Sequence, residues 1–188
     1  MNKFLIIGLG NIGGEYAHTR HNIGFDVADI LAEQLHIKFT SEKLATYAGG
    51  TYKGRQIYII KPTTYMNLSG KAVKYWAEFL KIDIENIIII VDDLALPFGT
   101  LRLKSKGSDA GHNGLRSIQS ELQTQNYPRL RFGIGNNFQK GKQIDFVLGK
   151  WNPEEQKYLK DRILLACEII LSFCFAGINN TMNTYNNK

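Results

Sequence analysis

The stretch Phe4-Leu5-Ile6-Ile7-Gly8-Leu9-Gly10-Asn11 lies near the start of a chain of 188 residues and decides how the rest is interpreted. Its apolar run is typical of a buried strand, and the glycines that follow predict a tight turn. The segment after the turn ends in Thr19-Arg20-His21-Asn22. Ligands collect at the carboxyl ends of strands in open α/β sheets, and histidine titrates nearest to neutral pH. We therefore expect a functional site around His21.

The glycines from Gly8 to Gly13 also match the dinucleotide-binding pattern G-x-G-x-x-G. That pattern requires a helix to begin within the turn, so that its N-terminus meets a pyrophosphate, and an acidic residue at the end of the next strand. Here residues 14–20 separate the turn from helical periodicity that begins near Ile23. The spacing argues against a nucleotide cofactor, and a nucleotide-binding oxidoreductase remains only as an alternative function.

Further along the chain, apolar or alternating runs alternate with helical stripes. The predicted strands are Lys3 to Leu9, Thr46 to Tyr52, Gln56 to Ile60, Ile87 to Val91, Thr100 to Leu103 and Leu130 to Ile134. The predicted helices contain the apolar stripes 23–35, 73–80 and 115–122, with Ser69 as a possible N-cap of the second, and a last helix runs from Pro153 to about Phe175 behind the cap residue Asn152.

This alternation predicts an α/β fold in which a central mixed, largely parallel twisted sheet is flanked by helices on both faces. Residues 49–54 indicate a hairpin. The whole chain, 1–188, is expected to form a single domain, because no linker or repeat divides it. The asparagine-rich end, residues 179–188, is poor in apolar residues and is expected to be a loosely held tail.

Charge and cysteine content narrow the function classes. The chain has 23 Lys and Arg against 17 Asp and Glu, which favours polyanionic partners such as RNA. Cys167 and Cys174 lie in an apolar helical run and are interpreted as buried reduced thiols. There is no signal-peptide pattern and no apolar run approaching the ~20 residues that span a bilayer. We expect a cytoplasmic protein without a membrane partner.

Two histidines and two carboxylates are the candidate titrating groups. His21 alone could be a hydrogen-bonded structural residue, but the apolar strand 87–91 delivers Asp92 and Asp93 to its end, where a carboxylate could meet the imidazole and raise its pKa. The alternative for this Asp pair is a turn or helix cap. His18 and His21 lack an evident third ligand, so no metal site is predicted.

Two segments place asparagine amides at predicted helix starts. Asn67 lies in Pro62-Thr63-Thr64-Tyr65-Met66-Asn67-Leu68-Ser69-Gly70, and Asn113 lies in Gly111-His112-Asn113-Gly114. Each could be a plain helix cap. Together with Asn11, His21 and an aspartate at strand-to-helix junctions, they indicate a site.

These same motifs carry a family resemblance. The pattern G-L-G-N-x-G-x-x-Y-x-x-T-R-H-N at 8–22, P-T-T-Y-M-N-L-S-G at 62–70 and G-H-N-G-L at 111–115 resemble bacterial peptidyl-tRNA hydrolase. Further matches are Asp92-Asp93 ahead of Leu96-Pro97, the run from Arg129 to Gly135, and Phe146 to Gly149. They span most of the chain in the family's order, with the C-terminal helix and tail least diagnostic.

The resemblance implies an enzyme without metal or cofactor that cleaves the ester between a peptide and the 3′ ribose of tRNA, recycling both. It implies that His21 is the general base, that Asp92 orients it, and that Asn11, Asn67 and Asn113 bind and polarise the peptidyl end. The remaining substrate-binding residues that it implies are Tyr16, Met66 and His112.

The basic residues near Gly111 have two interpretations. Lys104, Lys106, Arg129 and Arg131 could be ordinary solvated charges. By resemblance, Lys104 and Arg131 match a pair that binds the tRNA 5′ phosphate near the acceptor end. Peptidyl-tRNA is therefore the expected partner of what we expect to be a monomer. A catalytically silent RNA-binding relative is the remaining alternative.

Overall fold

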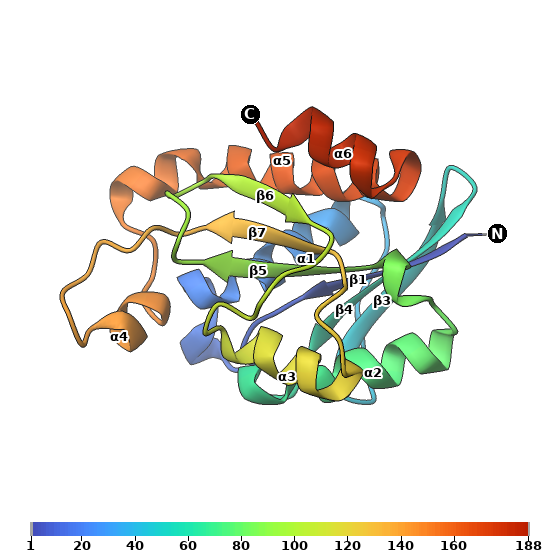
Figure 1. Cartoon of the computed structure of the whole chain (residues 1–188), viewed down its shortest axis with the longest axis horizontal. Coiled ribbons are helices and arrows are strands. Elements are labelled where there is room, and N and C mark those ends of the chain that lie inside the picture. Colours follow the sequence, from blue (N-terminus) through green and yellow to red (C-terminus); the bar gives the residue numbers. More distant parts are fainter. Residues whose placement is uncertain (1, 188) are drawn as a thin grey trace.

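The computed structural model describes residues 2–187 as a central sheet of seven strands with helices on both faces (Figure 1). The order across the sheet is β2-β3-β4-β1-β5-β7-β6. The strands are β1 (Lys3–Gly8), β2 (Thr40–Glu42), β3 (Ala45–Tyr52), β4 (Arg55–Pro62), β5 (Ile87–Asp93), β6 (Leu101–Lys104) and β7 (Arg129–Gly133).

The sheet is mixed, with a parallel centre. Strands β4, β1, β5 and β7 run parallel to one another, whereas β3 and β6 run antiparallel to their neighbours. The predicted mixed and largely parallel α/β fold in one domain is confirmed. The hairpin between β3 and β4 is confirmed too, and its two turn residues, Lys53 and Gly54, both have positive φ, as the tightest hairpin turns require.

Two hydrophobic cores lie on opposite faces of the sheet. Phe4 and Ile6 point into the core beneath α1 and α5, while Leu5 and Ile7 point into the core beneath α2 and α3. This alternation explains why the β1 run is apolar throughout, since both of its faces are buried. The helices are α1 (Ile23–Gln34), α2 (Ser69–Leu80), α3 (Asn113–Leu122), α4 (Gln143–Val147), α5 (Pro153–Ala176) and α6 (Ile178–Tyr185).

Of the two N-cap residues predicted from the sequence, one is confirmed and one is wrong. Asn152 caps α5 as predicted, because its side chain accepts from the Glu155 amide while the Glu155 carboxylate accepts from the Asn152 amide. Ser69 is not the cap of α2. It is the first residue of that helix, and its hydroxyl donates to the Met66 carbonyl at 2.8 Å. Periodicity did not reveal β2, which has three polar residues, or α4, which has five residues and is too short to show a repeat.

The C-terminal segment differs from its prediction. Helix α6, residues 178–185, contains most of the segment 179–188 that was expected to be a loosely held tail, and it lies against α5 and β6 (Figure 1). Asn186 extends this contact, because its side chain accepts from the Leu103 amide at 2.8 Å and donates to the Leu103 carbonyl at 2.9 Å. The asparagine that made the tail look unstructured thus satisfies the free edge of β6. Residue 188 lies outside the described residues.

Glycines bring β1 and α1 into direct contact. A Cβ on Gly24 would lie 2.4 Å from the Leu9 nitrogen and 2.7 Å from the Ile90 oxygen, and one on Gly8 would lie 2.1 Å from the Gly24 oxygen. The glycines of the first motif therefore serve helix–strand packing. This close approach holds the start of α1, and with it His21, beside the end of β5.

No helix within residues 2–187 combines the length and the apolar character that crossing a bilayer requires.

Candidate active site

Three segments bring one carboxylate and two imidazoles together where β1 and β5 end. His21 lies in the short 3-10 helix Arg20–Asn22, Asp92 is the residue before the last of the buried strand β5, and His112 precedes α3. The Nδ1 atom of His21 lies 2.9 Å from Asp92 Oδ2 and 3.0 Å from Oδ1. The Nε2 atom of His112 lies 2.8 Å from the same Oδ1. Asp92 is therefore shared between two histidines.

The backbone determines which nitrogen of His112 carries a proton. Its Nδ1 faces the amides of Gly114 at 3.1 Å and Leu115 at 3.4 Å, and both amides are donors. Nδ1 must accept, so the proton of a neutral His112 ring sits on Nε2 and is donated to Asp92. The side chain of His112 is thus the N-cap of α3, and neither of its ring nitrogens remains free for a substrate.

The shared carboxylate shifts the titration of the site. Burial alone lowers the pKa of His21, but the charge of Asp92 and its hydrogen bond outweigh that effect and raise the pKa above its ordinary value. Burial raises the pKa of Asp92, and the two histidines lower it by more, so Asp92 is ionised at neutral pH. With Nδ1 donating to this carboxylate, His21 keeps its Nε2 lone pair for a proton.

A second hydrogen-bonded unit orients Asn11. The Asn22 side chain accepts from the Asn11 amide at 2.9 Å and donates to the Asn11 carbonyl at 2.8 Å. The Asn11 side-chain oxygen accepts from the Met66 amide at 2.7 Å, which leaves its NH₂ group as the free end. Because Asn22 follows His21 directly, this unit connects the imidazole to the loop that carries Asn67.

The other predicted substrate-binding residues occupy different settings. Asn67 and Asn113 are exposed, and Asn113 accepts from Arg116 at 3.4 Å. Met66 is buried, with its sulfur against the position that a Cβ of Gly114 would take. Tyr16 is half-buried in the turn before His21.

Only some of the predicted site residues line the cleft, which has a volume of about 220 Å³. His21, Asp92, His112, Asn113 and Arg131 line it directly, opposite three side chains of α4: Gln143, Ile144 and Val147. Asn11, Tyr16, Met66, Asn67 and Lys104 are not in its wall. Asn11 and Met66 are nevertheless connected to it by the hydrogen bonds through Asn22, and Asn67 follows Met66 directly in the chain.

Arg20 holds the α4 wall in place. Its guanidinium is buried, donates to the Phe146 carbonyl at 3.1 Å and pairs with Glu155 at 2.9 Å, and it lies 4.2 Å from the centre of the Phe146 ring. The residue preceding the general-base candidate thus anchors the opposite side of the cleft. The T-R-H-N motif contained this arginine, but nothing in the sequence identified its partners.

The basic residues near the cleft divide into two groups. Arg129 is fully buried and donates to the carbonyls of Ser108 and Gln125, so it is neither a solvated charge nor available to a phosphate. Arg131 lines the cleft, where it pairs with Asp93 at 3.4 Å. Lys104 is exposed at the end of β6.

A metal ion fits this site poorly. The ligand atoms of His21, Asp92 and His112 lie within 4.8 Å of one another, as a metal site would require. However, His112 uses both ring nitrogens in hydrogen bonds to Asp92 and to the start of α3, and a histidine ligand needs a free lone pair. The donor set therefore favours a hydrogen-bonded unit over a metal centre.

Comparison with known proteins identifies close relatives. The sequence profile of the family described as peptidyl-tRNA hydrolase matches residues 5–188. Peptidyl-tRNA hydrolases of Phocaeicola vulgatus and Bacteroides fragilis are 60% and 59% identical over 186 residues, which are 99% of this chain and 100% of each relative. The crystal structure of peptidyl-tRNA hydrolase from Acinetobacter baumannii matches with a TM-score of 0.92 at 36% identity, covering 98% of this chain and 95% of that one.

Proposed function

The chain belongs to the peptidyl-tRNA hydrolase family and hydrolyses peptidyl-tRNA, and we propose that His21 and Asp92 are the catalytic pair. The observation that carries the proposal is the contact of 2.9 Å between His21 Nδ1 and the buried Asp92 carboxylate at the wall of a cleft. This contact directs the proton on His21 Nδ1 toward Asp92 and leaves His21 Nε2 free for a water molecule. A neutral imidazole held in this tautomer is a general base.

In the proposed reaction, His21 Nε2 takes a proton from water while the water oxygen attacks the ester carbonyl that joins the peptide to the 3′ ribose of tRNA. The tetrahedral intermediate then collapses, the bond to the ribose oxygen breaks, and the imidazolium returns its proton to that oxygen. The products are a peptide with a free carboxyl group and intact tRNA. Base catalysis of this kind contributes about 100-fold to 10,000-fold. No metal or cofactor takes part.

The asparagine amides are proposed to hold the peptidyl end. Asn11 offers an NH₂ group that the Met66 amide and Asn22 keep oriented, and the amides of Asn67 and Asn113 are exposed at neighbouring helix starts. An amide donor aimed at the developing oxyanion is worth roughly 3 to 4 kcal/mol. Tyr16 and Met66 would bound the same region. His112 is proposed to act through Asp92.

Lys104 and Arg131 are proposed to bind the 5′ phosphate beside the acceptor end. Arg131 lines the cleft that contains His21, and Lys104 is exposed on the neighbouring strand β6. Replacing both with Ala should raise the KM for peptidyl-tRNA and make the logarithm of kcat/KM depend less steeply on salt, because two phosphate contacts are lost. Replacing Lys53 and Lys157, which lie outside the cleft wall, is the matched control. An unchanged salt slope would remove this assignment.

We also propose that the enzyme works as a monomer in the cytoplasm. The residues assigned to catalysis all come from one chain, and both cysteines are free, which suits a reducing compartment.

The direct test is release of the blocked amino acid from N-acetyl-aminoacyl-tRNA. His21→Ala should lose ester cleavage by at least about 100-fold while it retains folding and tRNA binding. His36→Ala, the same change at an exposed histidine, should retain activity. Near-normal turnover in His21→Ala would refute the base assignment, and tRNA binding without ester cleavage by the unmodified chain would indicate a silent RNA-binding relative.

A further inference from the structure

Strand β6 lies at the edge of the sheet and presents two cations on one of its faces. Leu103 points into the core beneath α1 and α5, so the alternation of side chains places its neighbours Arg102 and Lys104 on the opposite face. The register of β6 against β7 sets Lys104 opposite Arg129 and Arg102 opposite Arg131. Like charges directly opposite one another destabilise strand pairing, so this short edge strand needs support from elsewhere.

The support comes from a single residue near the end of the chain. The Asn186 side chain accepts from the Leu103 amide at 2.8 Å and donates to the Leu103 carbonyl at 2.9 Å, as a further strand would. The Arg102 guanidinium donates to the backbone carbonyl of the same asparagine. Asn186 therefore holds both the backbone of β6 and one of its two cations.

A packed helix presents Asn186 to this edge. Asn186 is the C-cap of α6, and its amide donates to the Met182 carbonyl at 3.0 Å. Thr181 of the same helix is fully buried, and its hydroxyl lies 2.8 Å from the Ser172 hydroxyl of α5. Figure 1 shows α6 lying along α5 beside β6. The position of the Asn186 side chain is thus fixed by helix packing.

From these contacts we propose that Asn186 is a positioning residue for the 5′ phosphate of tRNA. It pairs with Leu103, the residue before Lys104, and it accepts from Arg102, which lies directly opposite Arg131. The Lys104 side chain then extends from an ordered strand end. This inference rests on the proposed binding of the 5′ phosphate by Lys104 and Arg131. Because Asn186 acts on binding of the phosphate and not on the ester, its loss should change KM and leave kcat unaltered.

The test compares two forms of N-acetyl-aminoacyl-tRNA, one with its 5′ phosphate and one from which a phosphatase has removed it. In Asn186→Ala the strand end is ordered for only a fraction of the time, and the apparent affinity for the phosphate falls by that fraction. Since two hydrogen bonds are lost, the KM for the phosphorylated form should rise about threefold to tenfold. The KM for the dephosphorylated form should stay within about twofold of that of the unmodified enzyme.

Asn187→Ala is the matched control, because Asn187 is the exposed neighbour of Asn186. It should leave the KM for both forms unchanged. Amide hydrogen exchange reports on the strand edge directly. The Leu103 amide should lose protection in Asn186→Ala and keep it in Asn187→Ala, while the amides of the buried strand β5 stay protected in both. Protection of β5 shows that each variant is folded.

Replacing Lys104 and Arg131 with Ala separates this inference from the assignment on which it rests. That double variant should have the same KM for both forms of the substrate. If it still prefers the phosphorylated form, the phosphate assignment fails and the positioning role falls with it. If it loses the preference while Asn186→Ala keeps the normal KM for the phosphorylated form, only the positioning role is refuted. An equal rise in KM for both forms in Asn186→Ala refutes that role too, because it indicates general damage.

Discussion

Asp92→Asn is the substitution that tests the catalytic geometry most sharply. Asp92 Oδ1 accepts from His112 Nε2 at 2.8 Å, and that nitrogen must carry its proton because His112 Nδ1 caps α3. An asparagine would keep its oxygen on His112, so its NH₂ group would face His21 Nδ1 in place of Asp92 Oδ2 at 2.9 Å. His21 would then have to accept at Nδ1 and carry its proton on Nε2, the wrong tautomer for a base.

The expected loss is the full contribution of general-base catalysis, about 100-fold to 10,000-fold in kcat, with little change in KM. The pH profile should change as well. In the unmodified enzyme, activity should rise with pH as His21 loses its proton, and the rise should lie above the ordinary histidine range because Asp92 raises the pKa. In Asp92→Asn, burial acts alone and lowers that pKa, so any residual activity should rise at lower pH.

The assay is release of blocked amino acid from N-acetyl-aminoacyl-tRNA between about pH 5 and pH 9, a window that brackets the ordinary histidine pKa. Asp93→Asn is the matched control, since Asp93 pairs with Arg131 and not with either histidine. It should raise KM and leave the acidic limb of the profile in place. The reasoning fails if Asp92→Asn keeps kcat within about threefold, or if its acidic limb coincides with that of the unmodified enzyme.

Two further predictions concern stability. Gly24→Ala should lower the free energy of unfolding, measured by urea denaturation, by about 1 to 3 kcal/mol, because the new Cβ would meet backbone atoms of Leu9 and Ile90. Gly14→Ala is the control, since a Cβ at Gly14 meets nothing within 4 Å. Equal losses in the two variants would refute the packing argument. Burial raises the pKa of Asp26 to about 6, so this group stabilises the fold below about pH 4 and loses that contribution as pH rises through 6. The free energy of unfolding at pH 7.5 minus that at pH 4 should therefore be about 2 kcal/mol larger in Asp26→Asn than in the unmodified protein. The same difference in both proteins would contradict this prediction.

The amino-acid sequence alone predicted features that depend on short-range patterns. The apolar run of β1 had to be buried on both faces, the run from Ile87 to Val91 had to deliver Asp92 to a strand end, and Asn152 with Glu155 had to start a helix. Each conclusion needs only neighbours within a few residues, because side-chain periodicity and capping act over one turn or one strand. The family motifs added candidate roles to these positions.

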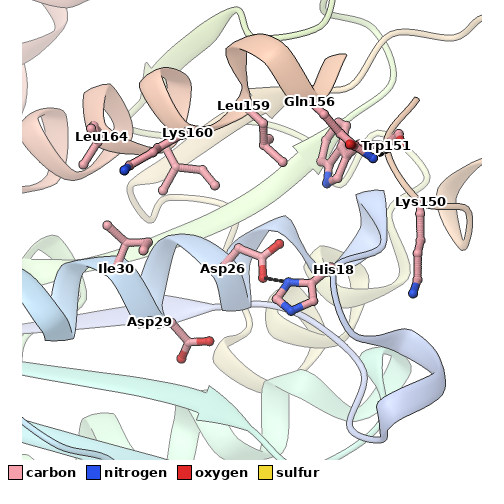
Figure 2. Close-up of a pocket in the computed structure, with 11 residues that line it drawn as sticks. His18, Asp26, Asp29, Ile30, Lys150, Trp151, Gln156, Leu159, Lys160 and Leu164 are labelled. Atoms are coloured by element: carbon pink, nitrogen blue, oxygen red, sulfur yellow. Dashed lines mark hydrogen bonds and ion pairs between the residues drawn. The ribbon is translucent and has the colours of Figure 1, made fainter. Parts of the chain in front are cut away.

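Only the tertiary structure decided which polar groups satisfy one another. His112 shares Asp92 from 20 residues away, Arg129 is buried because it reaches the Ser108 carbonyl 21 residues away, and Asn186 holds the end of α6 by pairing with Leu103. The indole nitrogen of Trp151 is buried without a hydrogen-bond partner in the described part of the chain, and this too emerges only once α1 and α5 pack together (Figure 2). These partners are mostly backbone groups, which every residue carries alike, so no sequence pattern can name them. Their pairing is decided by where the packed sheet and helices bring the chain together.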